Sequence, residues 1–423
     1  MAVAVIRRLR RNGHEALLAG GCVRDMLMGR RPADFDVATS ATPDEVARIF
    51  HRVIMVGAKF GVAMVIIDQR RIEVATFRTD VSYSDGRRPD SVRFASARED
   101  ALRRDFTING MFFDPLSGQV VDYVGGQEDL QAGVIRAIGD AEIRFSEDYL
   151  RMLRAVRFAN RFNFPLDEAT TRAIKARVEK IHGISGERIR EELEKMLSHV
   201  SAAKAMEMLH EMGLLQAILP ALFERESLWP AARQRMELLA IHRDYVLLMA
   251  ALLAELPAET IRALARAWGG SNLLKDSLLW LSTHHRHWQR PDMSLAQLKR
   301  LMANRDWQRL LVLWKAQERI ETGAEVNSLA LSRRASRVAP ESVAPPALVT
   351  GLDLKDLGLP SGPKLGSLLQ RLYEAQLDET ISTRPQAMEL ARSLIAGRQA
   401  GRRDAENTEM GSNREGNDAS PKR

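Results

Sequence analysis

The spacing of apolar residues divides this chain of 423 residues into two parts. Up to about residue 140, short apolar runs alternate with turn residues, which is typical of short strands mixed with helices. From Phe145 onward, apolar residues recur at intervals of three and four, which predicts helices. We therefore expect an α+β fold: a small head with a mixed β-sheet and helices, followed by an all-helical neck, body and tail.

The first elements of the head carry its most informative residues. An apolar strand ends at Gly20-Gly21, and an amphipathic helix is expected over 23–28. A second short strand follows, with the sequence Asp34-Phe35-Asp36. Because alternate residues of a strand share a face, we expect the two carboxylates to point together and Phe35 to point into the core.

Further along the head, the pattern predicts five more segments. They are a helix over 43–50 capped by Thr42, a hairpin of strands 60–68 and 72–77 with its turn at 69–71, a polar loop over 79–94 beside the site, a helix over 97–111, and a strand-turn-strand unit over 122–138. Glu73 lies within the second hairpin strand. Its carboxylate is either solvated on the outer face of the strand or lies near a metal as a third carboxylate, and we favour the position near the metal.

Composition and linker signals divide the helical part further. We expect a head over 1–140, a neck over 141–220, a body over 221–325, a basic proline-containing linker over 326–346, a helical tail over 347–396, and a disordered end over 397–423.

Charge and cysteine content narrow the class of protein. The chain has a formal net charge of +7 and one cysteine, Cys22. A single cysteine excludes a disulfide framework and fits a reducing cytosol. The longest apolar runs, such as 245–256, fall short of the roughly 20 residues that a membrane span requires. We therefore expect a soluble cytoplasmic protein without membrane contact, and the charge permits a polyanionic partner such as RNA.

The glycine turn and the two aspartates suit phosphate and metal chemistry. Backbone N–H groups at Gly21 and the side chain of Arg24 can approach an anion at the start of the helix. Asp34 and Asp36 repel each other unless a cation separates them, and oxygen-only ligands suit Mg²⁺ bridging to substrate phosphates. A Gly-Gly turn or an Asp-x-Asp alone is usually structural, so the combination carries the argument.

Two later strings add nucleotide-recognition candidates. Arg104 suits a triphosphate, and Asp105 or Asn109 suits sugar hydroxyls. The string EDYLRMLRAVRF forms a charged stripe beside an apolar face, and a carboxylate with a guanidinium matches a base edge. Charged helical faces are usually only solvated, and the preceding head favours the recognition role. The stripe consists of Asp148, Arg151, Arg154 and Arg157.

Together these strings resemble the class II tRNA nucleotidyltransferases (CCA-adding enzymes) and bacterial poly(A) polymerases. The resemblance covers residues 16–220 closely through GGCVRD, DFD, RRDFTING, EDYLRMLRAVRF and GERIREEL. It returns near Lys364, which looks like part of an RNA-contacting tail. The resemblance implies a Mg²⁺-dependent transferase with Asp34 and Asp36 holding metal, Asp148 and Arg151 reading the base, and CTP, ATP and tRNA as partners.

The sequence leaves alternatives open. A poly(A) polymerase shares the head and neck, although the short tail of mixed charge favours tRNA as the substrate. An enzyme adding only A also remains, whereas the apparently intact loop over 79–94 argues against a CC-only enzyme. A catalytically dead RNA-binding module would be expected to have lost Asp34, Asp36 or Arg24, and all three are present.

Overall fold

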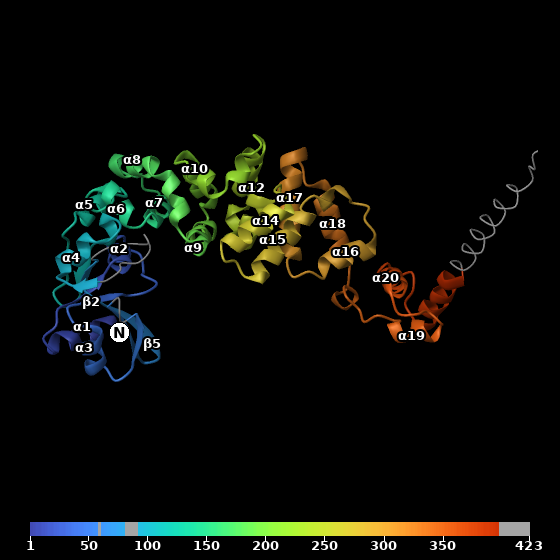
Figure 1. Cartoon of the computed structure of the whole chain (residues 1–423), viewed down its shortest axis with the longest axis horizontal. Helices are drawn as coiled ribbons and strands as arrows, with labels where there is room; N and C mark the ends of the chain where they lie inside the picture. The colour runs from blue at the N-terminus through green and yellow to red at the C-terminus, as the bar shows by residue number, and fades with distance from the viewer. Residues whose placement is uncertain (58–60, 81–91, 397–423) are drawn as a thin grey trace, which may run out of the picture. The chain divides into compact units, whose positions relative to one another are not determined.

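The computed structural model describes residues 1–57, 61–80 and 92–396. Most of the expected polar loop, at 81–91, and the expected disordered end, at 397–423, lie outside the described residues. The chain forms two compact units, Met1–Thr283 and His284–Arg423. In Figure 1 the first unit runs from blue to yellow and the second from orange to red.

The head contains a seven-stranded mixed sheet, as the sequence predicts. Its strand order is β3-β4-β5-β2-β1-β8-β9, with β2 and β5 parallel and the other neighbours antiparallel. The strands are β1 (Ala16–Ala19), β2 (Val37–Thr39), β3 (Val53–Gly57), β4 (Val62–Ile67), β5 (Arg70–Thr76), β8 (Phe112–Asp114) and β9 (Gln119–Val121).

Helices cover both faces of this sheet. One core joins residues of the sheet to α1 (Ala2–Arg11), α2 (Gly21–Leu27) and α3 (Pro43–Ile49), and the other joins it to α4 (Ala97–Leu102). Strand β1 contributes Ala16 and Leu18 to the first core and Leu17 and Ala19 to the second. Because alternate side chains enter opposite cores, the whole strand is buried and shows no polar alternation.

Several local predictions are confirmed or shifted by one or two residues. Helix α3 begins after Thr42 with a reciprocal cap between Thr42 and Glu45. The hairpin turns at Asp68 and Gln69, whose φ values are 47° and 63°, so Arg70 and Arg71 already belong to β5. Two positive φ values match the two-residue turn that follows strand twist.

Three of the five segments predicted further along the head are wrong in secondary structure. The expected helix over 97–111 ends at Leu102, because Phe106 is fully buried and pairs with Ala137 across the fold. The expected strand-turn-strand over 122–138 instead contains helix α5 (Gly126–Ala132), flanked by left-handed Gly125 and Gly133. The ends of the expected loop over 79–94 form a short ladder of β6 (Arg78–Asp80) and β7 (Val92–Phe94).

Helices make up the rest of the first unit. Helix α6 (Ala141–Glu147) ends at Asp148 and α7 (Leu150–Phe162) follows at once, so the predicted continuous charged stripe is interrupted at its first member. The other α-helices are α8 (Glu168–Ala176), α9 (Gly186–Leu197), α10 (Ala202–Glu211), α11 (Leu214–Ile218), α12 (Leu228–Leu239), α13 (Tyr245–Leu253), α14 (Ala258–Ala267) and α15 (Asn272–His284).

The second unit is also helical. Its elements include α16 (Leu295–Met302), α17 (Trp307–Thr322), α18 (Val326–Ser336), α19 (Gly351–Asp356), α20 (Pro363–Leu377) and a helical segment over 384–396. Helix α18 occupies the first half of the stretch expected to be a linker, and it buries Ser328 and Leu331. Its arginines misled the prediction because they lie beside a buried face. No helix in the described part of the chain is long and apolar enough to cross a membrane.

Candidate active site

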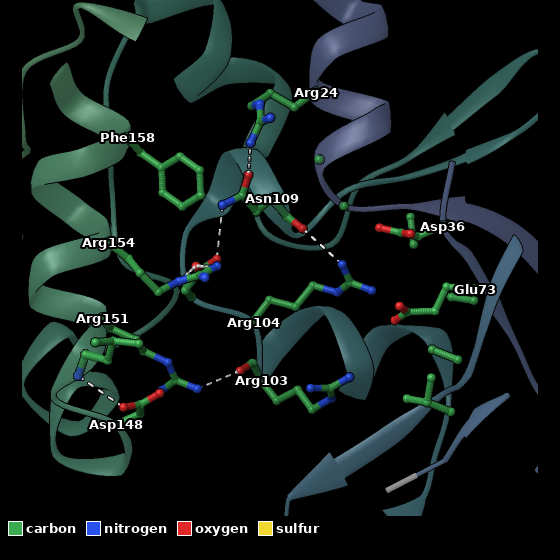
Figure 2. Close-up of a pocket in the computed structure, with 18 of the residues that line it drawn as sticks. Arg24, Asp36, Glu73, Arg103, Arg104, Asn109, Asp148, Arg151, Arg154 and Phe158 are labelled. Atoms are coloured by element: carbon green, nitrogen blue, oxygen red, sulfur yellow. Dashed lines mark hydrogen bonds and ion pairs between the residues drawn. The ribbon is translucent and has the colours of Figure 1, made fainter. Parts of the chain in front are cut away.

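A pocket of about 570 Å³ lies in the first unit, between the sheet of the head and helix α7. Figure 2 shows Asp36 and Glu73 on one side of it and Arg151, Arg154 and Asp148 on the other. The sequence-predicted residues that line it are Gly21, Arg24, Asp36, Glu73, Arg104, Asp105, Asn109, Asp148, Arg151, Arg154 and Arg157.

Two predicted residues lie outside this pocket. Asp34 lines a neighbouring pocket of about 620 Å³, which also contains Asp36 and Glu73. Lys364 is exposed in the first turn of α20, in the second unit. The structure therefore brings the head and neck candidates together and leaves Lys364 as a separate surface residue.

The register of two parallel strands explains why Asp36 lies beside Glu73. Val37 of β2 is paired with Val74 of β5, so the residues preceding them are neighbours at the same end of the two strands. Asp36 is accessible to solvent, yet the surrounding protein displaces much of its water, and this burial and the charge of Asp34 raise the pKa of Asp36. Burial and the charge of Asp36 likewise raise the pKa of Glu73. The carboxylates thus form a site that favours a cation.

Phe35 does not enter the core as expected. Its side chain is 37% exposed, and it lies before β2 rather than within it. The alternation of a strand therefore does not apply to Asp34-Phe35-Asp36, although Asp34 and Asp36 still lie close enough to interact.

The Gly-Gly turn is a requirement of close packing. Gly20 has φ +72°, and a Cβ at this position would lie 2.7 Å from Nη1 of Arg104. The Gly20 N–H donates to the carbonyl of Met111 at 3.0 Å. Next to the turn, Cys22 is 3% exposed and its thiol donates to the carbonyl of Ala19. The turn thereby lets Arg104 pass directly beside the backbone that leads into α2.

A chain of hydrogen bonds joins Arg24 to Arg154 across the pocket. Arg24 donates to Oδ1 of Asn109 at 2.6 Å, and Nδ2 of Asn109 donates to Asp105 at 3.1 Å. Arg154 donates twice to Asp105, at 2.8 and 2.6 Å. Burial alone would raise the pKa of Asp105, but Arg154 and the hydrogen-bond donors lower it to about 2. Figure 2 shows this chain linking the head to α7.

A second buried carboxylate, Asp100, fixes the two arginines that follow α4. It accepts hydrogen bonds from Arg103 at 2.9 and 2.6 Å and from Arg104 at 3.2 and 2.9 Å. Burial opposes its charge, and the two arginines hold the pKa of Asp100 below its usual range. Arg104 is thereby held in place at the pocket wall.

The charged side chains at the junction of α6 and α7 form ion pairs with residues that do not belong to the predicted stripe. Asp148 is held by Arg188 at 3.1 and 2.7 Å, and Arg151 pairs with Glu147.

Arg157 donates to Glu192 of α9 at 2.6 Å. Arg151 and Arg157 are both only 8% exposed. The stripe is therefore largely enclosed by α9 and the head, rather than solvated.

Sequence reasoning missed several residues that line the pocket, among them Arg78, Arg103, Phe158, Arg161 and Arg188. Phe158 belongs to the apolar face that the sequence predicts for this helix. Arg161 follows Arg157 by one helical turn and could have been added from spacing. Arg188 lies in the GERIREEL string, but its pairing with Asp148 is a contact across 40 residues and leaves no local pattern.

Two family models match the chain. Residues 16–136 match the Poly A polymerase head domain, and residues 163–225 match the probable RNA and SrmB-binding site of polymerase A. The first match covers the head strands and the carboxylates. The second begins directly after α7 and includes α9.

Similar proteins carry two related names. The chain is 42% identical over 310 residues to the CCA-adding enzyme of Geobacillus thermodenitrificans, covering 71% of this chain and 76% of the relative. It is 42% identical over 232 residues to Poly(A) polymerase I of Salmonella typhi, covering 52% of this chain and 50% of the relative. The crystal structure of the Bacillus stearothermophilus CCA-adding enzyme in complex with CTP is 32% identical, with a TM-score of 0.73 over 94% of this chain and 98% of that one.

Proposed function

The chain belongs to the CCA-adding enzyme family of nucleotidyltransferases, and we propose that it adds C, C and A from CTP and ATP to the 3′ end of tRNA and releases pyrophosphate. The observation that supports this function best is the pocket itself. It places carboxylates on the head opposite an arginine-rich wall on the neck. The likeness to a CTP complex over nearly the whole chain supports CTP as a ligand.

We propose Asp34 and Asp36 as the ligands of Mg²⁺, with Glu73 as a third carboxylate beside them. The donor set fits, because it contains only oxygen ligands, and the pKa values of Asp36 and Glu73 are raised by burial and by a neighbouring carboxylate whose repulsion a cation would relieve. Within the described residues, no group of three His, Cys, Asp or Glu side chains could hold a metal ion by itself. Phosphate oxygens of the substrate would therefore complete the coordination. When bound, Mg²⁺ would neutralise charge on the triphosphate and activate the RNA 3′-hydroxyl.

The phosphate side of the pocket consists of Gly21, Arg24 and Arg104. Arg24 is 5% exposed and Arg104 is anchored by Asp100, so both guanidinium groups are positioned before the nucleotide binds. Fixed donors of this kind lose little freedom on binding and favour in-line transfer. Asn109 supports Arg24 directly.

Asp105 is expected to contact the ribose, but its observed bonds favour a positioning role as well. Its two oxygens already accept from Arg154, Asn109 and the backbone N–H of Phe106. A ribose hydroxyl would therefore join an existing network, in which Asp105 holds Arg154 toward the pocket.

Asp148 and Arg151 are proposed to read the base, with Arg154 and Arg157 supporting them. CTP and ATP both present an exocyclic amino donor beside a ring nitrogen acceptor, which a carboxylate and a guanidinium complement. Asp148 accepts three hydrogen bonds, from Arg188 and from the backbone of Leu150. A carboxylate offers about four acceptor sites, so Asp148 retains capacity for the amino group.

The test presents the purified protein with Mg²⁺, CTP and ATP, first with tRNA lacking its 3′ end and then with unstructured RNA. We expect two C and one A on the tRNA and then a stop. Long A tracts on either RNA would identify a poly(A) polymerase, and A added only to tRNA ending in CC would identify a partial enzyme. We expect the enzyme to act in the cytoplasm, which its single cysteine fits.

Two single substitutions test the assignment of the metal ligands. Asp34→Ala and Asp36→Ala should abolish incorporation while tRNA binding, measured by filter retention, stays near the wild-type value. The matched control is Asp44→Ala, which removes an exposed carboxylate from the first turn of α3. Activity within about tenfold of wild type in either pocket variant would remove the assignment.

A further inference from the structure

We call the pocket of about 570 Å³ between the head sheet and α7 the nucleotide pocket. A smaller pocket of about 270 Å³ adjoins it. It lies between α7 and the end of α9, and Arg157 and Arg161 line both pockets. Lys195 and His199 line only the smaller one. The nucleotide site described above uses neither of them.

Cations surround this second pocket in excess. Arg157 and Lys195 share one carboxylate, Glu192, at 2.6 and 2.9 Å. Arg161, Arg30 and Arg243 come from three separate segments, and the charge of all three lowers the pKa of His199, after the larger effect of burial. Of these cations, Arg157, Arg161 and Lys195 line the pocket itself, and its described lining residues include no carboxylate. This arrangement favours an added anion.

His199 lines the pocket and carries a hydrogen-bond donor. The backbone N–H of Ser201 donates to Nδ1 of His199 at 3.3 Å. Because a backbone N–H cannot accept, Nδ1 is the acceptor and neutral His199 carries its hydrogen on Nε2. The pocket therefore combines cationic side chains with a hydrogen-bond donor, and both suit the oxygens of a phosphate.

We propose that this pocket binds a backbone phosphate of the RNA strand whose 3′ end is extended in the neighbouring site. The inference rests on the proposed function and adds a binding site to it. RNA is favoured over free phosphate because Lys195 and His199 lie within residues 163–225, which match the model of an RNA-binding region. The shared residues Arg157 and Arg161 connect this phosphate to the nucleotide pocket, so the strand is held next to the reacting end.

The first test follows the pKa of His199 by NMR of histidine-labelled full-length protein, with His199→Gln used to assign its signal. A bound phosphate stabilises the imidazolium, so tRNA lacking its 3′ end should raise the pKa by about one pH unit. An equal rise with pyrophosphate alone would assign the pocket to the product instead. No rise with either probe would overturn the site.

The second test uses the double variant Arg30→Gln/Arg243→Asn, which removes two cations that line neither pocket. Asparagine suits position 243 because its φ is 52°. We expect KM for tRNA to rise roughly three- to tenfold and the salt dependence of tRNA binding to weaken, because these two charges attract the phosphate from outside the pocket lining. KM for CTP should stay within about twofold, since the nucleotide pocket is untouched.

The matched control is Arg172→Gln/Arg262→Gln, which removes two arginines from exposed ion pairs of the same unit. An equal rise in KM for tRNA in this control would attribute the effect to net charge and overturn the proposal. The two proposals can fail separately. Wild-type protein that shifts His199 with tRNA but adds no CCA would contradict the proposed function alone, and CCA addition without the shift would contradict this pocket alone.

Discussion

Individual arginines in this site are held by carboxylates that belong to other elements. Arg154 is held by Asp105 of the head, and Arg157 by Glu192 of α9. Breaking a buried pair leaves an uncompensated charge, which costs several kcal/mol, about 3–5 in measured cases. Substitutions of these carboxylates should therefore disturb stability as well as activity, whereas substitution of a base-contacting arginine should act mainly on selectivity.

Arg151→Ala tests that difference at the position proposed to read the base. Loss of a bidentate contact to a base edge reduces discrimination by about 1–3 kcal/mol, or roughly ten- to a hundredfold. We expect the ratio of CTP to UTP incorporation to fall by that factor, together with the rate. The measurement is single-nucleotide addition to tRNA with each of the four nucleotides. An unchanged ratio would place base selection in other residues.

Asp105 predicts a pH dependence of stability. Its pKa in the folded protein is about 2, below the usual aspartate value of about 3.8, so its stabilising contribution is present above about pH 4 and is lost as the pH falls toward 2. The difference in unfolding free energy between wild type and Asp105→Asn should shrink by about 1 kcal/mol from pH 6 to pH 3. Urea denaturation at several pH values measures it. Parallel curves for the two proteins would contradict the pairing with Arg154.

At the scale of elements, α9 positions charged side chains of the site through ion pairs. It supplies Arg188 to Asp148 and Glu192 to Arg157. Its first residue, Gly186, lies against the end of α14, where an added Cβ would be 2.0 Å from the carbonyl oxygen of Ala267. The position of α9 thus depends on a glycine that lines neither pocket.

Gly186→Ala should lower the unfolding free energy by about 1–3 kcal/mol, because backbone must move to admit the methyl group. Thermal and urea denaturation provide the measurement. The control is Gly183→Ala, where an added Cβ has nothing within 4 Å. Equal stability of the two variants would show that α9 does not depend on this contact.

The sequence predicted those elements that depend on local patterns. The capped start of α3 is such a case, and so is the glycine turn before α2. The prediction from sequence was wrong where a contact with a residue far away in the chain determines the structure. Helix α4 ends early because Phe106 pairs with Ala137, and Asp148 turns toward Arg188 of a later helix.

The candidate site was predicted more completely than the secondary structure around it. The side chains of Arg104, Asp105 and Asn109 reach the pocket although the helix expected to carry them has ended. Their types and order predicted that they belong to one site, and the tertiary fold determines how they converge on the pocket.

At the scale of the whole molecule, the nucleotide pocket and Lys364 belong to different units of the chain. The proposed catalytic residues lie in the first unit, and the candidate RNA contact at Lys364 lies on an exposed turn of the second. We therefore expect substitutions in the second unit to change tRNA binding without changing nucleotide selection.

Lys364→Gln should weaken tRNA binding. It should also reduce the slope of the logarithm of the binding constant against the logarithm of salt concentration by about 1, as loss of one phosphate contact does. KM for CTP should not change. Steady-state kinetics at two salt concentrations measure both effects, with Lys355→Gln on α19 as the charge-matched control. A variant indistinguishable from this control would remove Lys364 from the RNA contacts.

The buried thiol of Cys22 makes the chain suitable for site-specific fluorescent labelling without prior removal of a native cysteine. Burial raises the pKa of Cys22, and thiol-reactive dyes require an accessible thiolate. Cysteines introduced at Ile241 and Leu352, which are 78% and 71% exposed, would place one dye on each unit. Energy transfer between these dyes would then follow the separation of the two units through successive nucleotide additions.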